Sequence, residues 1–234
     1  MKLYTQTVSK ELLAVLTELM GIKELRGYRL VGGTSLALQF GHRKSVDIDL
    51  FAGGNENTEN LPKILSTHFS SFELISKNRN GLMGLINNIK VDVLDWKVPF
   101  VEAPLLEKGL RLASAPDIFA FECDAILERK AEKDFVDIAM IATQHELYKL
   151  FAVLRQRYFY ITGGSIAALL LKPDAIIRDY SIKYFEPYSF EFFKDSIAKK
   201  INDHENDLNN RKKSELETRD QKIQSVIEQK RKKQ

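Results

Sequence analysis

The residues with the clearest chemical potential are two aspartates two positions apart, Asp47 and Asp49. They lie in a short apolar segment, 46–51, which we predict to be a strand. Successive side chains alternate across a strand, so both carboxylates should project from one face. Two carboxylates on one face repel each other unless a cation or solvent compensates. The pair therefore predicts a site for a divalent cation, Mg²⁺ or Mn²⁺, with oxygen ligands.

A third carboxylate comes from Asp92, in a further predicted strand over 89–96. If this strand lies beside the first, Asp92 completes a set of catalytic and metal-binding residues with Asp47 and Asp49. Two divalent metal ions held by such a set can bind the attacking and leaving oxygens of a phosphoryl transfer. The alternatives are that Asp92 simply faces solvent, or that Asp95 at the strand end is the relevant acid.

A pair of glycines, Gly32 and Gly33, follows a predicted short strand at 28–31 and precedes a predicted helix at 34–40. Glycine lets the backbone approach a phosphate closely, and the N–H groups of Thr34 and Ser35 would point at that phosphate from the helix start. All four residues are therefore candidates for binding a nucleoside triphosphate.

Charged residues further along the chain add weaker candidates for nucleotide binding. Arg43, next to His42, either orders the loop before the aspartates or contacts phosphates. Arg129, Lys133 and Asp137 are four residues apart and are predicted to share one helix face. That face is either an exposed, ion-paired surface or one that closes over the nucleotide, and we count Lys133 and Asp137 as candidates with Arg43.

The remaining elements predict an α+β fold. A first helix is capped by Ser9, and a second covers 61–69. Strands are expected at 72–76 and 82–87, with a hairpin turn at 87–88, and residues 99–111 are expected to be irregular. Two helices are expected over 117–146 and more beyond 147; within them, 160–169 echoes the first glycine pair and is interpreted as a loop. The predicted domains are a core at 1–111, a helical domain at 112–198 and a charged helical tail at 199–234.

Composition favours a cytoplasmic protein without a membrane segment. Of 234 residues, 44% are hydrophobic and 29% charged, with a single cysteine, Cys123. The N-terminus lacks the apolar run of a signal peptide, and no stretch reaches the roughly 18 apolar residues that span a bilayer. The net charge of +3 says little about partners. The mixed-charge tail is either a solvated helix or a basic arm for RNA.

Five segments of the chain, spread over about residues 24–145, resemble the AbiEii/AbiGii nucleotidyltransferase toxin family of abortive-infection and type IV toxin–antitoxin systems. They are Val31–Leu38, His42–Phe51, Ile89–Asp92, Gly109–Ile118 and Lys133–Ile138. The resemblance implies a polymerase-beta-like nucleotidyltransferase core followed by a helical C-terminal part. It also implies that Asp47 and Asp49 bind metal and that Gly32, Gly33 and Ser35 form the triphosphate-binding turn. Members use a nucleoside triphosphate, some act on transfer RNA, and a cognate antitoxin protein often accompanies them.

One departure from the family pattern bears on activity. Glu122 stands where the family usually carries a lysine. A lysine there would meet the triphosphate as a point charge, whereas a glutamate reverses that charge. Either Lys130 or Lys133 replaces it from a nearby turn, or activity is reduced, altered or lost.

The sequence thus predicts a metal-dependent enzyme that moves a nucleotidyl group from a nucleoside triphosphate to a hydroxyl acceptor, RNA or transfer RNA, as a toxin or phage-defence protein. Two alternatives remain open. Glu122 favours a degenerate, non-catalytic member that binds nucleotide or a partner. A small-molecule nucleotidyltransferase would instead have an acid-lined pocket and no affinity for RNA.

Overall fold

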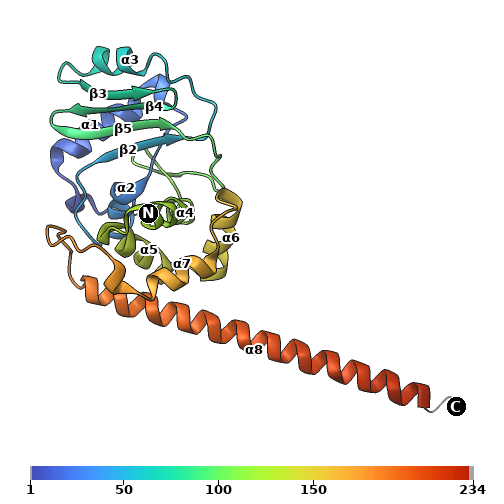
Figure 1. Cartoon of the computed structure of the whole chain (residues 1–234). Helices are drawn as coiled ribbons and strands as arrows, with labels where there is room; N and C mark the ends of the chain where they lie inside the picture. Colours follow the sequence, from blue (N-terminus) through green and yellow to red (C-terminus); the bar gives the residue numbers. More distant parts are fainter. Residues whose placement is uncertain (1, 232–234) are drawn as a thin grey trace.

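The computed structural model describes residues 2–231, with side chains described through residue 223 (Figure 1). Its centre is a mixed sheet of seven strands in the order β3-β4-β5-β2-β1-β7-β6. The strands are β1 (Arg29–Leu30), β2 (Ile48–Ala52), β3 (Glu73–Asn78), β4 (Gly81–Ile86), β5 (Ile89–Asp95), β6 (Leu105–Glu107) and β7 (Leu110–Leu112). The predicted α+β class is confirmed.

The two strands that carry the aspartates are direct neighbours. β2 pairs with β5 in parallel, and β4 pairs with β5 in an antiparallel hairpin. The hairpin turn at Asn87 and Asn88 is confirmed, and both residues have positive φ, 52° and 61°, as a tight hairpin turn requires. The sheet therefore brings together strands that are about 40 residues apart in sequence.

One face of the sheet is covered by α1 (Lys10–Gly21) and α3 (Leu61–His68). Ser9 caps α1 as predicted, its Oγ accepting a hydrogen bond of 3.0 Å from the Leu12 N–H. Leu50, Val91 and Val93 point into this apolar core and are fully buried. The residues that alternate with them along β2 and β5 face the opposite side, which is where the aspartates lie.

A second core forms beneath the other face of the sheet. It is built from α2 (Gly32–Phe40), α4 (Ala115–Arg129), α5 (Glu132–Gln144), α6 (Leu147–Arg157), α7 (Gly163–Leu170) and the start of α8 (Phe190–Arg231). Phe119, Phe135, Leu150 and Phe193 are buried there. Figure 1 shows these helices gathered below the sheet, with α8 extending away from them. Three short 3₁₀ helices, Thr5–Thr7, Lys23–Leu25 and Pro173–Ala175, complete the elements.

The prediction that 99–111 is irregular is wrong over its second half. Residues 105–112 form the β6–β7 hairpin, and β7 joins the sheet in parallel with β1, pairing Leu112 with Leu30. The turn uses Lys108 and Gly109, both at positive φ. Each strand has only three residues, too few for a periodic signal, so its neighbours in the sheet decide its conformation.

Two expectations about helices are also corrected. Gly163 and Gly164 begin α7 rather than forming a loop, with the Thr162 hydroxyl accepting from the Ser165 N–H at 3.1 Å. Arg129 ends α4, and Lys133 and Asp137 lie in α5, so the three do not share one helix. The chain turns at Lys130, which has a left-handed φ of 48°.

The domain division remains a prediction, and its boundaries fall inside elements. Residue 112 ends β7, and residues 198–199 lie within the continuous helix α8. The side chains described beyond residue 204 in α8 are exposed. Lys232 and Lys233 of the proposed basic arm lie outside the described residues. Over the described part of the chain, every helix is too short or too polar to cross a bilayer.

Candidate active site

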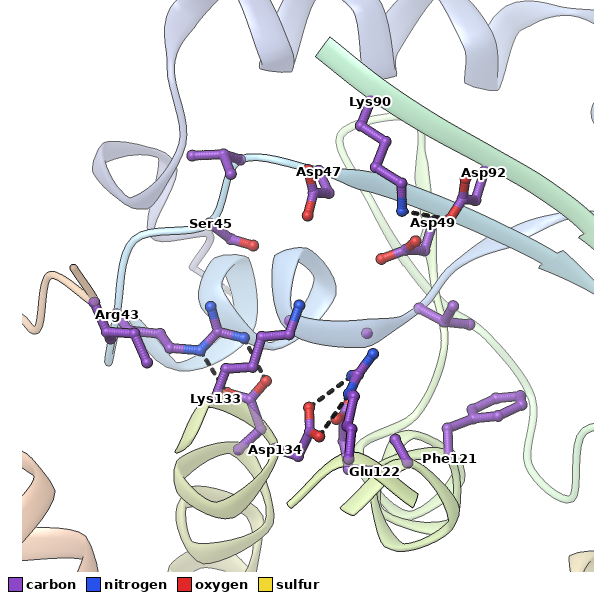
Figure 2. A pocket seen from close by; sticks show the side chains of 18 of the residues that line it. Arg43, Ser45, Asp47, Asp49, Lys90, Asp92, Phe121, Glu122, Lys133 and Asp134 are labelled. Carbon is purple, nitrogen blue, oxygen red and sulfur yellow. Dashed lines mark hydrogen bonds and ion pairs between the residues drawn. The ribbon is translucent and has the colours of Figure 1, made fainter. Parts of the chain in front are cut away.

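A cleft of about 690 Å³ lies between the open face of the sheet and the helices below it (Figure 2). Its walls come from β2 and β5, the first residues of α2, the facing sides of α4 and α5, and the segment 179–183. Of the predicted site residues, the cleft is lined by Gly32, Gly33, Arg43, Asp47, Asp49, Asp92, Lys133 and Asp137. The chain thus gathers most of its predicted chemical groups in one place.

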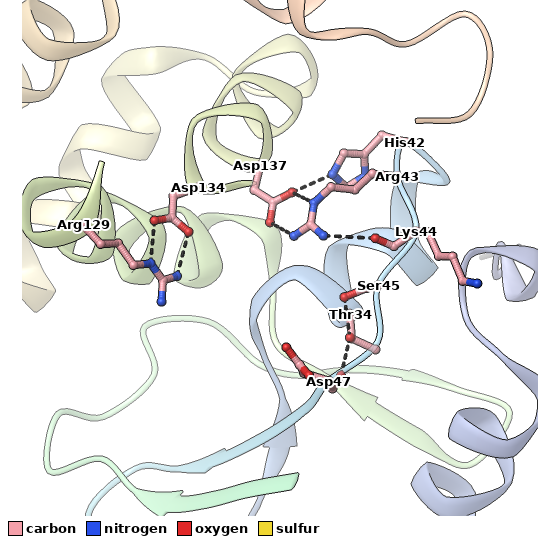
Figure 3. Close-up of polar contacts among 9 residues, drawn as sticks. All are labelled: Thr34, His42, Arg43, Lys44, Ser45, Asp47, Arg129, Asp134 and Asp137. Atoms are coloured by element: carbon pink, nitrogen blue, oxygen red, sulfur yellow. Dashed lines mark hydrogen bonds and ion pairs between the residues drawn. The ribbon is translucent and has the colours of Figure 1, made fainter. Parts of the chain in front are cut away.

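The three aspartates meet at the centre of this cleft. Asp49 and Asp92 are direct partners in the parallel register of β2 and β5. Asp47 lies one residue before β2, which begins at Ile48 rather than at Val46 as predicted. The Thr34 hydroxyl donates to the Asp47 carbonyl and lies 2.8 Å from the Ser45 hydroxyl (Figure 3). Because α2 holds this backbone in place, Asp47 stays beside Asp49 without a strand of its own.

The carboxylates are incompletely neutralised by the protein. Burial, and then the negative charge of Asp92, raises the pKa of Asp49 to about 6. Lys90 donates from Nζ to Asp92 Oδ2 at 2.8 Å, whereas Asp92 Oδ1 is buried and has no hydrogen-bond partner in the described part of the chain. A buried oxygen without a partner is costly, so this site is suited to an added cation.

The carboxylate oxygens of the cleft suit a hard divalent ion that keeps some of its water ligands. Among the described residues, no three histidine, cysteine or acidic side chains converge as a closed metal cage. Mg²⁺ is usually held by one or two carboxylates together with waters and substrate phosphates, so a closed cage is not required. Asp47 and Asp49 would hold it, with Asp92 beside them, and the metal-binding roles of all three residues remain predictions.

Asp95, the alternative acid, has a different task. It is buried and accepts hydrogen bonds from the Gly54 N–H at 2.6 Å and the Glu56 N–H at 3.1 Å. It therefore fixes the loop after β2 and is absent from the lining of the cleft.

Lys90, two residues before Asp92 on β5, is the cation that the fold places among the aspartates. Burial alone would lower the pKa of Lys90. The hydrogen bond to Asp92 and the negative charges of Asp92, Asp49 and Asp47 outweigh burial and raise this pKa. Figure 2 shows its ammonium group pointing toward the aspartates. An ammonium group at this position competes electrostatically with a dication.

We expect Lys90→Met to bind Mn²⁺ about tenfold more tightly than the wild-type protein in the absence of nucleotide, because a competing charge is removed. Electron paramagnetic resonance of free Mn²⁺ measures this affinity. Lys133→Met is the matched control, since Lys133 also acts on Asp49 through its charge but makes no hydrogen bond to the three aspartates. An equal gain in Mn²⁺ affinity in both variants would show a general electrostatic effect and contradict a specific competition between the Lys90 ammonium group and the metal ion.

The glycine turn is built by the start of α2, two residues earlier than predicted. Gly32 has φ +63°, and a Cβ there would lie 3.0 Å from Asp49 Oδ2, so glycine is required on both counts. A Cβ on Gly33 would overlap the Arg43 guanidinium. Thr34 and Ser35 are buried, and their side chains do not line the cleft. The contribution of Thr34 to an anion site is limited to its backbone N–H, which the first turn of the helix leaves free, whereas the N–H of Ser35, the fourth residue of α2, belongs to the hydrogen bonding of the helix itself.

Arg43 and Asp137 form an ion pair with each other. Arg43 donates from Nε to Asp137 Oδ1 at 2.8 Å and from a terminal nitrogen to Oδ2 at 2.5 Å, and His42 Nε2 lies 2.7 Å from Oδ1 (Figure 3). Burial alone would raise the pKa of Asp137, but the charge of Arg43 and these hydrogen bonds lower it to about 2. The pair ties the loop before β2 to α5, which supports the loop-ordering alternative for His42 and Arg43, and contact of Arg43 with a nucleotide remains a prediction.

Arg129 and Lys133 are the cations that face the cleft from the helices. Arg129 donates through Nε and one terminal nitrogen to the two oxygens of Asp134, each at 2.7 Å, while 52% of its side chain remains exposed. Asp134 thus positions Arg129 over the cleft. Neither Arg129 nor Asp134 was a predicted site residue, and the two-carboxylate spacing Asp134–Asp137 in the sequence was the available signal.

The structure changes the meaning of Glu122. Its side chain lines the cleft from α4 but is buried, and burial together with Asp137 and Asp134 raises the pKa of its carboxyl group well above the ordinary range. This favours a neutral carboxyl group, which would not repel a triphosphate as an ionised one does. Of the two possible substitute lysines, Lys133 lines the cleft and Lys130 does not.

Sequence reasoning also missed one side of the cleft. Phe51, Trp96, Phe121, Asp124 and Tyr158 line it there. They come from β2, the end of β5, α4 and the residue after α6, so no local pattern in the sequence connects them. The segment 179–183 was missed for the same reason.

The N-terminal part of the chain matches a known protein family. The model of the family described as "Nucleotidyl transferase AbiEii toxin, Type IV TA system" matches residues 23–79. That match confirms the resemblance to the AbiEii family. It includes the glycine turn, Asp47 and Asp49, and it ends before Asp92 and the helical part.

One sequence relative and two solved structures match over most of the chain. The uncharacterized protein aq_aa25 of Aquifex aeolicus (strain VF5) is 26% identical over 199 residues, which cover 81% of this chain and 96% of the relative. The structure of JHP933 from Helicobacter pylori matches with a TM-score of 0.59 and 15% identity, over 91% of this chain and 99% of that one. A putative nucleotidyltransferase from H. pylori matches with a TM-score of 0.58 and 15% identity, over 84% and 93%. The chain therefore has a nucleotidyltransferase fold with a helical C-terminal part.

Proposed function

We propose that this protein is a metal-dependent nucleotidyltransferase that transfers a nucleotidyl group from a nucleoside triphosphate to a hydroxyl group of RNA. The observation that carries the proposal is the placement of Asp49 opposite Asp92, beside Asp47 and the glycine turn of α2. A site for phosphate and a site for divalent metal thus share one cleft, and AbiEii resemblance adds to this support.

In this proposal the triphosphate lies against the first turn of α2. The N–H groups of Gly32, Gly33 and Thr34 donate to phosphate oxygens, because the helix start leaves them free, whereas Ser35 is the fourth residue of α2 and supports the turn from within the helix. Lys133 and the exposed side of Arg129 add positive charge from the facing helices. A neutral Glu122 is compatible with this arrangement, so Lys133 takes over the role of the missing lysine.

The chemical step is an in-line displacement at the α-phosphorus. The acceptor hydroxyl oxygen forms the new bond to phosphorus, the bond to the oxygen bridging the α- and β-phosphates breaks, and pyrophosphate leaves. Asp92, through its unpartnered oxygen Oδ1, accepts the hydroxyl proton. Bound Mg²⁺ would neutralise charge on the phosphates, and Asp47 and Asp49 would hold it.

RNA as acceptor rests on the family resemblance and on exposed aromatic residues near the cleft. Tyr180 lies between two lining residues and is 87% exposed, and Phe159 follows the lining residue Tyr158 and is 89% exposed. Such rings can stack with unpaired bases. A toxin role with a cognate antitoxin follows from the matched family's description, and a cytoplasmic location follows from the need for triphosphates and RNA.

The proposal is tested by incubating the protein with each labelled triphosphate, Mg²⁺ and total bacterial RNA. Label on RNA with the wild-type protein and none with Asp47→Ala/Asp49→Ala is the expected result. Nucleotide binding without any transfer would favour the non-catalytic alternative, for which Glu122 is the specific observation. Transfer to small molecules without RNA binding would favour the small-molecule alternative, whose predicted acid-lined pocket is compatible with the nine carboxylates around the cleft.

A further inference from the structure

The cleft has two chemically different sides. Figure 2 shows Arg43 and Ser45 on one side of the aspartates and Phe121 on the other, with Lys133 between them. Next to Arg43, Lys44 and Lys183 also line the cleft and are joined by a backbone hydrogen bond of 2.8 Å. The phosphate tail of a bound nucleotide is attracted toward the lysines Lys44, Lys133 and Lys183, which leaves the Phe121 side for the nucleoside.

The Phe121 side presents flat aromatic surfaces. Phe51 and Trp96 lie nearly parallel, with an interplanar angle of 6° and ring centroids 5.9 Å apart. Phe121 meets Trp96 edge-on at 6.3 Å, and the Arg157 guanidinium lies 4.0 Å from the Phe121 ring centroid. All three rings line the cleft and are only partly buried. Bases stack on aromatic surfaces of this kind.

The polar groups at the same side favour a hydrogen-bond donor. Asp124 lines the cleft, and its Oδ1 accepts a hydrogen bond of 2.9 Å from the Tyr160 hydroxyl, which fixes its position. An ionised carboxylate only accepts hydrogen bonds, so its partner in a ligand must donate. Tyr158 also lines the cleft and is 4% exposed, and its hydroxyl has no hydrogen-bond partner among the described residues.

We propose that this side of the cleft is the nucleobase subsite, where Trp96 and Phe121 stack the base and Asp124 selects bases with an amino group. Adenine and cytosine present an amino donor at the position where hypoxanthine and uracil present a carbonyl acceptor. A carboxylate attracts the first pair and repels the second. The inference rests on the proposed function and names its donor as a triphosphate whose base carries an amino group, such as ATP or CTP, and excludes UTP.

The test uses the protein's single tryptophan as a probe. Trp96 fluorescence and calorimetry are recorded on the full chain with Mg²⁺ and non-hydrolysable analogues of CTP, UTP, ATP and ITP. CTP and UTP form one matched pair, and ATP and ITP form the other. Within each pair, one base carries an amino group where the other carries a carbonyl group. We expect quenching of Trp96, with CTP bound about tenfold more tightly than UTP and ATP about tenfold more tightly than ITP.

Three variants locate the selectivity. Asp124→Asn, which adds a donor at equal size, should reduce both preferences to about twofold or less. Tyr160→Phe should weaken them in part, because it removes only the hydroxyl that fixes Asp124. Glu18→Gln, at an exposed acid of α1, is the matched control and should behave as wild type.

Several results would overturn the inference while leaving the proposed function intact. Calorimetric binding without a change in Trp96 fluorescence would place the base elsewhere. Selectivity that survives Asp124→Asn would remove Asp124 as the selecting residue. No binding of any nucleotide would instead refute the proposed function, and the inference with it.

Discussion

Asp49→Asn is expected to abolish nucleotidyl transfer, by about 1,000-fold or more, and to stabilise the metal-free protein. The loss of activity follows because an amide replaces a carboxylate that would hold the metal beside Asp92. The gain in stability follows because the pKa of Asp49 is raised to about 6 by burial and by Asp92. Each pKa unit corresponds to about 1.4 kcal/mol, so a pKa raised from 3.8 to about 6 predicts a rise in the free energy of unfolding of about 3 kcal/mol at pH 7.5.

The pH dependence of this gain has a definite sign. The unfolded state ionises Asp49 at lower pH than the native state, so raising the pH favours unfolding of the wild-type protein relative to the variant. The stability difference should be small near pH 4, grow up to about pH 6 and stay constant above that. Urea unfolding in the presence of EDTA measures it. Asp95→Asn is the control, because Asp95 accepts two backbone hydrogen bonds and its loss should destabilise the fold. Equal destabilisation of both variants would contradict the electrostatic explanation.

The second large effect is on folding stability and comes from Asp137→Ala. This change leaves the Arg43 guanidinium, whose side chain is 7% exposed, without its carboxylate partner in the protein interior. Breaking a buried ion pair in this way costs about 3–5 kcal/mol. The loop that leads to Asp47 should loosen at the same time, so hydrogen exchange is expected to increase over residues 41–47. Chemical denaturation and hydrogen exchange measure the two effects.

Asp134→Ala is the matched control for this prediction. Its partner Arg129 forms an equally close pair, but 52% of that side chain is exposed, so water can replace the lost carboxylate. We expect a loss of about 1 kcal/mol. The double variant Arg43→Met/Asp137→Leu should recover at least half of the loss from Asp137→Ala, because it removes both charges. If Asp137→Ala costs no more than Asp134→Ala, the interpretation of Asp137 as a buried anchor is wrong.

The Arg43–Asp137 pair also explains where sequence reasoning reached its limit. From the sequence, Arg43 either orders the loop or contacts phosphates, and Asp137 is a candidate because it belongs to a predicted charged helix face. The fold places them against each other, 94 residues apart in sequence. Burial favours this pairing, since a buried carboxylate requires partners, and Asp137 has Arg43 and His42.

The sequence alone determined the features that depend on local spacing. Alternation along a strand gave the shared face of Asp47 and Asp49, the glycine pair gave a helix start with free N–H groups, and Asn87 and Asn88 gave the hairpin. These follow from backbone geometry over a few residues, so a single segment contains all the information needed.

The tertiary structure decided everything that depends on which segments become neighbours. It placed Asp92 beside Asp49, put the Lys90 ammonium among the aspartates, buried Glu122 and collected aromatic rings from separate elements into one side of the cleft. It also formed β6 and β7, which are too short to be recognised alone. The physical reason is that burial, charge neutralisation and strand pairing are properties of contacts between distant residues, and local periodicity does not contain them.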